Sequence, residues 1–472
     1  MFKLHDVHAR KDTRLGASEG SSASQKMVRR QVWGYLLDIL ILAAMSAILF
    51  WGISTQFPNS YNDVTRYQCY ANVFWKGTPG LASLPKQQCA FLSASSSASL
   101  IQKMQAHHFP ASLIRLVQSQ STSQPFHALP PEYPLLTIVL FTPPLIAPQQ
   151  WYQVGFALWM IGVAAVIYFV LKRYRSTRAA IAFAVYLAIG SWATALGRFD
   201  LIPAGLTLGA MILALRRRWT WAFVLLAFAT LLKFYPVVLV VPFLIAQQMQ
   251  SKERWSSWRR WSGLAVFVVL CVVVMVGSLL LNVADTLEPV NYFVNRPTQI
   301  ESLQASILWL GHFFGYKTSE VFTYQSLNLL STLSSKVSLV STLCLVLGLL
   351  YTFWLQWRGK VDLATASLLT LLIVMVTGKV FSPQYLIWVT PLIAYVGGAN
   401  WKWVIGWVCV GALTTVIFPY LYDNYLIDRY FWVIVVRNVV MLVFTLGLLL
   451  YVGFAGRAEK LEYDAGTVKV RD

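Results

Sequence analysis

Residues 219–247 read WTWAFVLLAFATLLKFYPVVLVVPFLIAQ, and this stretch decides how the chain is folded. It is apolar throughout except for one charge, Lys233, which is followed by Phe-Tyr-Pro236. A charge inside a membrane segment is costly and marks a functional site by default. Proline favours the first turn of a helix, so Pro236 indicates that a second helix starts there. We therefore predict two short helices that form a hairpin with Lys233 at its tip.

Two other stretches combine a cation with a proline a few residues later. They are Arg198-Phe-Asp-Leu-Ile-Pro203 and Lys379-Val-Phe-Ser-Pro383. A helix N-terminus carries partial positive charge and free N–H groups. Arg binds phosphate bidentately and Lys binds it as a point charge. Three such tips would therefore form an anion site at membrane depth.

The composition indicates a polytopic membrane protein. Apolar residues make up 57% of the 472 residues, and long apolar runs recur along the chain. The net charge of +19 is explained by basic loops that face anionic lipid. Nothing resembles a nucleic-acid-binding module, so we expect membrane lipids and no nucleic acid as partners.

The basic clusters fix the expected topology, because cytoplasmic loops are enriched in Lys and Arg. Reading 219–247 as two helices keeps every basic cluster on one side, with both termini cytoplasmic. The result is an all-α protein with about twelve transmembrane helices. The predicted spans are 33–53, 150–171, 178–196, 201–215, 219–232, 236–248, 262–283, 337–357, 362–378, 383–397, 401–419 and 430–453.

This topology divides the chain into three parts. Residues 1–30 are expected to be a disordered basic cytoplasmic tail, 31–455 the transmembrane domain, and 456–472 a second cytoplasmic tail. Residues 54–149 and 284–336 become large extracytoplasmic loops. The apolar run 134–146 is short and rich in proline, so it is placed in the outer interface. Residues 299–309 have helical apolar spacing, at Ile300, Leu303 and Ile307, and are predicted to form an amphipathic helix over the membrane.

The first outer loop holds a candidate general base and a candidate disulfide. Asp63 follows the first span, where a carboxylate would be placed to take a proton from a substrate. A helix cap, or a partner for Arg66, is the alternative reading. Cys69 and Cys89 lie in the same loop, where a disulfide is plausible outside the cytoplasm. The sequence leaves both questions open.

The other acidic residues near the tips also have several readings. Glu132 could be an acid, a metal ligand, a partner for a recessed cation, or a simple interfacial charge. Asp200 could pair with Arg198 in its own tip, whereas Lys233 has no acidic neighbour within its hairpin. There is no HxxxH or HExxH pair, so a zinc site is unsupported.

Six motifs together resemble glycosyltransferase family 87, a bacterial family of the GT-C superfamily. They are Asp63, Glu132-Tyr133-Pro134, Arg198-Phe-Asp200, Lys233-Phe-Tyr235-Pro236, Gln299-Ile-Glu301-Ser302 and Ser382-Pro-Gln384-Tyr385-Leu-Ile-Trp388. The resemblance covers roughly residues 30–455. The family includes polyprenol-phosphate-mannose-dependent α-(1→2)-mannosyltransferases. It therefore implies a GT-C fold in a bacterial plasma membrane, with the active site on the extracytoplasmic side.

The resemblance also implies a reaction and roles for the residues. A sugar, mannose by analogy, would pass with inversion from a polyprenyl phosphate to a hydroxyl of a glycolipid or glycan acceptor. Asp63 would be the base, and Arg198, Lys233 and Lys379 would hold the donor phosphate. The weaker candidates for substrate binding are Arg66, Glu132, Tyr133, Asp200, Tyr235, Glu301, Gln384 and Tyr385. No cofactor is expected; Asn62 stands beside Asp63 in place of a second acid, so a divalent metal is not implied, although it is not excluded.

Two other classes of protein fit part of the pattern. A lipid or lipid-linked sugar flippase would also use broken helices and recessed cations to bind a lipid phosphate. A flippase needs no general base and usually has inverted repeats, which the sequence does not show. An O-antigen ligase or polymerase would also be polytopic with a large outer loop.

Overall fold

The computed structural model describes residues 16–57, 62–94, 97–422 and 427–455, which are mostly helical. Within these residues, six helical segments are long and apolar enough to cross a membrane. They are Val32–Ser54 in α1 (Gly16–Ser54), Gln149–Tyr174 in η4 (Gln149–Trp151) and α6 (Tyr152–Tyr174), α11 (Trp258–Leu281), α14 (Ser334–Trp357), Trp401–Leu421 in α17 (Trp401–Thr415) and η6 (Val416–Leu421), and Arg429–Gly453 in α18 (Ile427–Ala455).

Shorter apolar helices occupy the remaining predicted spans. They are α7 (Thr177–Gly190), α8 (Leu201–Leu215), α9 (Trp219–Leu232), η5 (Tyr235–Leu239) with α10 (Val240–Gln250), α15 (Leu363–Thr377) and α16 (Tyr385–Gly397). Each of the twelve predicted spans thus coincides with an apolar helix, and the expected helical membrane fold is confirmed. The short helices α15 and α16 are buried along most of their length, whereas only 6% of the spanning window of α14 is buried.

The prolines stand where the returning helices start. Pro203 lies in the first turn of α8, Pro236 in the first turn of η5, and Pro383 just before α16. A proline in a first turn removes no hydrogen bond, because that N–H has no partner within the helix. The three hairpin tips inferred from the sequence are therefore present.

The stretch 219–250 forms two arms, as predicted. Lys233, between the arms, contacts Asp200 at the tip before α8. Gln248, near the end of the second arm, accepts a hydrogen bond from Arg260 in the first turn of α11. The second arm therefore runs back from the Lys233 tip to the end of the bundle where α11 begins.

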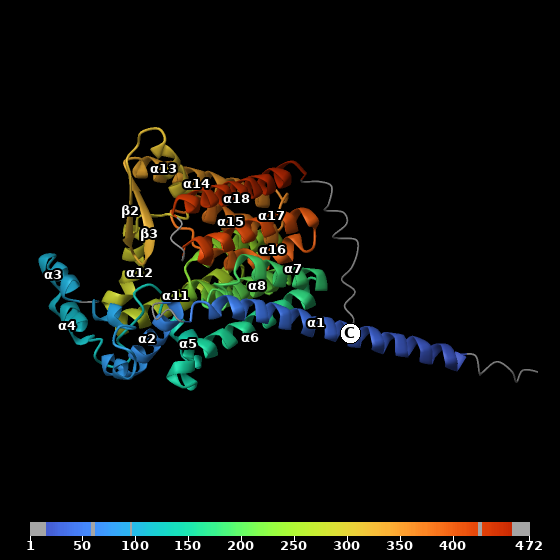
Figure 1. Cartoon of the computed structure of the whole chain (residues 1–472), viewed down its shortest axis with the longest axis horizontal. Helices are drawn as coiled ribbons and strands as arrows, with labels where there is room; N and C mark the ends of the chain where they lie inside the picture. Colours follow the sequence, from blue (N-terminus) through green and yellow to red (C-terminus); the bar gives the residue numbers. More distant parts are fainter. Residues whose placement is uncertain (1–15, 58–61, 95–96, 423–426, 456–472) are drawn as a thin grey trace, which may run out of the picture.

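The remaining elements gather at one end of the bundle, opposite the end from which the first half of α1 projects (Figure 1). The first outer segment contains α2 (Asp63–Lys76), η1 (Thr78–Ser83), η2 (Ala90–Ala94), α3 (Ala98–Ala106), α4 (Ala111–Ser119), α5 (Thr137–Phe141) and η3 (Pro143–Ile146). The second contains α12 (Val283–Asn295), α13 (Leu303–His312) and the strands β1 (Thr298–Gln299), β2 (Thr318–Thr323) and β3 (Ser326–Ser331). The strands form an antiparallel sheet in the order β1-β3-β2.

The second outer segment differs from the expectation in two respects. The sheet was not predicted, and Gln299 lies in β1, so the helix begins only after Ser302, whose hydroxyl accepts a hydrogen bond from the Ala305 N–H. Ile307, one of the apolar positions of the predicted amphipathic helix, is 45% exposed. The helix buries Leu308 and its neighbours, because α13 packs against the start of α18 and the sheet.

The tails bear on the predicted domain boundaries. Helix α1 already begins at Gly16, inside the segment that we expected to be disordered. Residues 1–15 and the predicted tail 456–472 lie outside the described residues. The run 134–146 forms the short helices α5 and η3, with Val139 and Ile146 63% and 92% exposed.

Candidate active site

Asp63 is the first residue of α2, and Asn62 caps this helix by accepting a hydrogen bond from the Thr65 N–H at 2.9 Å. The Asp63 side chain is 22% exposed and forms an ion pair with Arg198. A second guanidinium lies nearby, with Arg66 Nη1 3.7 Å from Asp63 Oδ1. Asp63 is thus partly accessible and lies beside two cations, and the helix cap is Asn62 rather than Asp63.

Arg66 links two parts of the first outer segment, the start of α2 and the stretch before α5. Its Nη2 lies 2.6 Å from Glu132 Oε1 and also donates to the Tyr70 hydroxyl at 3.2 Å. The side chains of Arg66 and Glu132 are only 10% and 11% exposed. Glu132 therefore pairs with a cation, which is one of the roles that the sequence left open. That cation is Arg66 rather than Arg198, Lys233 or Lys379.

Lys233 is paired with an acid from the neighbouring tip. Its Nζ lies 2.5 Å from Oδ1 of Asp200, a residue that is fully buried. Trp388 Nε1 donates to the same carboxylate oxygen. The other oxygen of Asp200 is buried and has no hydrogen-bond partner among the described residues. Arg198 thus pairs with Asp63, and Asp200 pairs with Lys233. Arg198 and Asp200 do not form the ion pair with each other that the sequence allowed.

Aromatic rings enclose this charged cluster. The Lys233 amine lies 5.1 Å and 5.2 Å from the ring centroids of Phe199 and Trp388. The Trp388 ring stacks between those of Tyr235 and Tyr385, at 4.2 Å and 3.7 Å. Rings that surround an ammonium group stabilise its charge and exclude water. The candidates Tyr235 and Tyr385 therefore lie beside Lys233.

Tyr133 lies on the other side of the cluster. Its ring packs edge-on against Phe199 at 5.1 Å and against Tyr67 at 5.9 Å. Burial, and next the charge of Glu132, raise the pKa of the Tyr133 hydroxyl. Tyr133 is thus a neutral hydroxyl beside the cations.

Lys379 is held by different contacts from the other two tips. Its Nζ donates to the Val294 carbonyl at 2.9 Å, and its own carbonyl accepts from the Gln299 N–H at 2.9 Å. Burial, and next the charge of Arg296, lower the pKa of Lys379. The Lys379 tip is therefore tied to α12 and β1. In the same tip, Gln384 accepts a hydrogen bond from Ser382.

Arg296 is a cation that the sequence analysis missed. Its Nη2 donates to Ser326 Oγ at 2.7 Å, and its guanidinium lies 5.5 Å from the centroid of the Tyr292 ring. Its signal was Pro297, since the pair repeats the combination of a cation and a following proline. Arg296 and Lys379 together form a second cationic group near Tyr385.

Glu301 is buried in a separate polar cluster. Its Oε1 accepts a hydrogen bond from the Tyr430 hydroxyl at 3.1 Å, and its backbone carbonyl accepts from Arg437 Nη2 at 2.7 Å and from Asn438 Nδ2 at 3.2 Å. Burial raises the pKa of Glu301 to about 7. Arg437 is fully buried in α18 and was also missed. The rule that singled out Arg198, a charge within an apolar span, applies to Arg437 as well.

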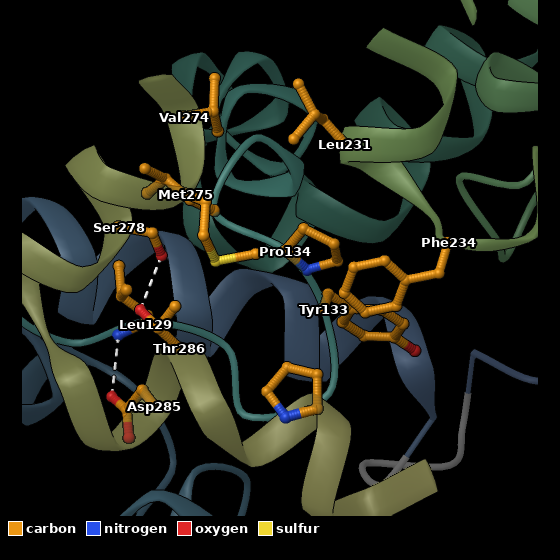
Figure 2. Close-up of a pocket in the computed structure, with 12 residues that line it drawn as sticks. Leu129, Tyr133, Pro134, Leu231, Phe234, Val274, Met275, Ser278, Asp285 and Thr286 are labelled. Carbon is orange, nitrogen blue, oxygen red and sulfur yellow. Dashed lines mark hydrogen bonds between the residues drawn. The ribbon is translucent and has the colours of Figure 1, made fainter. Parts of the chain in front are cut away.

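A small apolar pocket of about 30 Å³ lies near the charged cluster. It is lined by Leu231, Val274 and Met275, and by Tyr133 and Phe234, the sequence neighbours of Glu132 and Lys233 (Figure 2). Two hydrogen bonds hold the far wall together. Asp285 accepts one from the Leu129 N–H at 3.1 Å, and the Ser278 and Thr286 hydroxyls form the other at 2.7 Å.

Two further predictions concern the chemistry of the outer loop. Cys69 and Cys89 form a disulfide that joins α2 to the loop before η2. Within the described part of the chain, no group of three His, Cys, Asp or Glu side chains could hold a metal ion.

The fold and the site define a polytopic membrane protein with a carboxylate and cations at one end of its helical bundle. The chain belongs to glycosyltransferase family 87, whose sequence profile matches residues 132–383. It is accordingly a membrane glycosyltransferase. The match includes the Arg198, Lys233 and Lys379 tips, whereas Asp63 lies before it.

Comparison with other proteins adds one structural likeness. The crystal structure of ArnT from Cupriavidus metallidurans in the apo state has a TM-score of 0.42 and 15% sequence identity, over 90% of this chain and 78% of that chain. At this level the likeness supports no conclusion about the site. No curated protein matches the sequence.

Proposed function

We propose that the protein transfers a sugar, mannose by family analogy, from a polyprenyl monophosphate to a hydroxyl of a glycolipid or glycan acceptor, with inversion. The observation that carries this proposal is the ion pair between Asp63 and Arg198. This ion pair joins the candidate base to the Arg198 tip. Asp200, in the same tip, forms an ion pair with Lys233. Base and cations therefore meet at one site.

Asp63 acts on the acceptor. Its carboxylate takes the proton of the attacking hydroxyl as the acceptor oxygen bonds to the anomeric carbon from the face opposite the phosphate. The bond between that carbon and the phosphate oxygen breaks, and the phosphate leaves with the electron pair. A carboxylate that is 22% exposed can be reached by a substrate.

Arg198 and Lys233 act on the donor. Both are already paired with protein carboxylates, but a guanidinium has five N–H donors and an ammonium has three, so each can also bind phosphate. Positive charge placed against the leaving phosphate stabilises it as its charge develops. Lys379, tied to α12 and β1, stays a prediction as a third phosphate ligand.

Apolar surface beside the cations is compatible with a lipid-linked donor. Tyr133 and Phe234 line a small apolar pocket and are the sequence neighbours of Glu132 and Lys233, so the first carbons of a lipid chain would find apolar contacts next to the phosphate. Asp63 and Glu301 belong to the outer segments at one end of the bundle (Figure 1). This is the end that the charge pattern assigns to the extracytoplasmic side. A bacterial plasma membrane location with both termini cytoplasmic is part of the proposal.

The test is a donor panel with protein purified into nanodiscs. Polyprenyl-phosphate mannose, polyprenyl-phosphate arabinose and GDP-mannose are each supplied with a glycolipid extract, and the products are identified by mass spectrometry. We expect transfer from the mannosyl lipid only. Transfer from GDP-mannose would exclude the lipid donor, and transfer from the arabinosyl lipid alone would exclude mannose.

A further inference from the structure

One face of helix α2, opposite the face that carries Asp63, lines a second cavity. Gln68, Asn72, Trp75 and Lys76 follow one another at spacings of four, three and one residues, so they form one stripe on the helix. This stripe lines a cavity of about 320 Å³, bounded on its other side by Thr142, Gln149 and their neighbours. The volume falls within the ~300–1,000 Å³ that is typical of small-molecule sites.

Trp75 forms an aromatic wall of this cavity. The residue is 42% exposed, yet its Nε1–H donates to Thr142 Oγ1 at 2.9 Å, which fixes the orientation of the indole. The rings of Phe74 and Phe126 pack edge-on against it at 5.1 Å and 5.7 Å. An indole whose polar N–H is already satisfied offers its apolar face to a ligand.

Buried amides form the polar wall. Gln68 Nε2 donates to the Gln149 carbonyl at 2.9 Å, and its Oε1 accepts from Gln88 Nε2 at 3.0 Å. Asn72 Nδ2 donates to the Gln68 carbonyl at 2.9 Å. Gln88 is itself fixed, because the next residue, Cys89, is bonded to Cys69. The amides are thus held in place before any ligand arrives.

The combination of groups selects the ligand. A rigid aromatic face suits the C–H face of a sugar ring, and fixed amides suit its hydroxyls. An alkyl chain would use none of the remaining hydrogen-bonding capacity of these amides, and a divalent cation would require carboxylates. Lys76, exposed at the rim, adds a cation that tolerates a phosphate or carboxylate next to the sugar.

The position of the cavity indicates where the sugar comes from. Leu145 lines it, and the adjacent Ile146 is 92% exposed, as expected for a side chain immersed in lipid. The cavity would then open at the level of the lipid headgroups. Along α2, twelve residues separate Asp63 from Trp75, or about 18 Å at the helical rise, so this sugar is not the one that reacts.

We infer that this cavity is a carbohydrate-binding subsite for the sugar headgroup of a membrane glycolipid, separate from the catalytic centre. The connection of this subsite with the acceptor rests on the proposed function, because a glycolipid bound here would supply or extend the acceptor. The binding itself requires no turnover and can be measured alone.

Saturation-transfer NMR with the full chain in nanodiscs tests the site. The probes are methyl α-mannoside, methyl β-glucoside and methyl α-arabinofuranoside. We expect at least one to bind, and Trp75→Ala to weaken it by about tenfold, which corresponds to about 1.4 kcal/mol. Trp75→Leu, which keeps apolar volume in case the alanine variant does not fold, should weaken it equally. Trp151→Ala is the matched control, because Trp151 is also exposed but does not line the cavity.

Two comparisons complete the test. Nanodiscs that contain a monoglycosyl diacylglycerol should displace the bound glycoside; binding that is unaffected by this lipid would assign the site to a soluble glycan and overturn the membrane source. Asp63→Asn should bind the glycoside like wild type while transfer is lost, which separates this site from the proposed function. Absence of binding in wild type, or binding in both Trp75→Ala and Trp75→Leu that is as tight as in wild type, would overturn the subsite.

Discussion

Asp63 and Glu301 are carboxylates in the two outer segments, and they differ in exposure and in partners. The Asp63 side chain is 22% exposed and contacts the guanidinium groups of Arg198 and Arg66. Glu301 is 3% exposed; its carboxylate accepts from the Tyr430 hydroxyl, and Arg437 donates to its backbone carbonyl instead. Burial raises the pKa of Glu301 to about 7.

The difference separates a reactive acid from a structural one. A base must be within reach of the substrate, and the Asp63 side chain is partly exposed. A buried carboxyl whose pKa lies near neutrality is readily protonated, and its neighbours then need not provide a full counter-charge. Glu301 therefore anchors the β1–α13 turn to α18, whereas under the proposed function the region of Asp63 performs the chemistry.

Asp63→Asn should produce the largest effect. The amide keeps the size of the side chain but cannot accept the proton, so kcat should fall by roughly 10²–10⁴-fold, the usual contribution of a general base. The thermal midpoint should change little. Steady-state transfer from the polyprenyl-phosphate sugar measures the loss, with Glu320→Gln, an exposed acid in β2, as control. A rate within tenfold of wild type would assign the base elsewhere.

Lys233→Ala sharpens the reactive side of the comparison. Loss of one phosphate contact should raise the donor Kd by roughly tenfold or more, since a charge-assisted hydrogen bond contributes about 1.5–3 kcal/mol. The variant leaves buried Asp200 without its cation, so the Lys233→Ala/Asp200→Asn pair is the folded control. Donor titration in nanodiscs gives the result. If the double variant binds donor like wild type, Lys233 does not contact the phosphate.

Arg437→Met tests the anchoring side. The substitution keeps most of the apolar volume but removes the donor to the Glu301 carbonyl, at a cost of roughly 1.5–3 kcal/mol in stability. We expect a lower thermal midpoint and a kcat per folded molecule close to that of wild type. Arg437→Lys should recover part of the midpoint. A selective fall in kcat at unchanged stability would move this cluster into the active site.

Glu301→Gln should have the smallest effect, and it is visible only in pH dependence. The pKa of Glu301 is raised by burial to about 7 from an ordinary 4.5, so the folded chain retains a proton that the unfolded chain releases. Stability should therefore fall as the pH rises from 4.5 to about 7 and then level off. Thermal midpoints from pH 4.5 to 8 should show this slope in wild type and Glu320→Gln. The same slope in Glu301→Gln would refute the assignment.

The sequence was sufficient for the helices and the tips, because both depend on local patterns. Apolar run length located every span, and the Lys233–Pro236 motif divided 219–247 correctly. Asp63 could be selected because it immediately follows a span. The Cys69–Cys89 pairing remained open, since spacing alone cannot show that two cysteines meet.

Tertiary pairing was beyond the same reasoning. Lys233 has no acid within its own hairpin, and its partner Asp200 comes from the tip before α8. Lys379 carries the same local motif but is tied to Val294 and β1. Such partners depend on which helices pack together, and no local pattern in a single sequence shows which helices are neighbours. Arg437 was different, since the signal was present and was overlooked.

The short central helices have a consequence for donor selection. At 13 to 15 residues, α8, α9 and α16 are about 20–22 Å long, against roughly 30 Å of hydrocarbon. The helical part of the protein is therefore thinner here than the hydrocarbon core of the bilayer. The phosphate of a lipid donor can then reach Lys233 while its lipid chain stays in the bilayer. Most of an isoprenoid tail then stays among the surrounding lipids. Under the proposed function, the enzyme should be indifferent to the length of its carrier beyond the first few isoprene units.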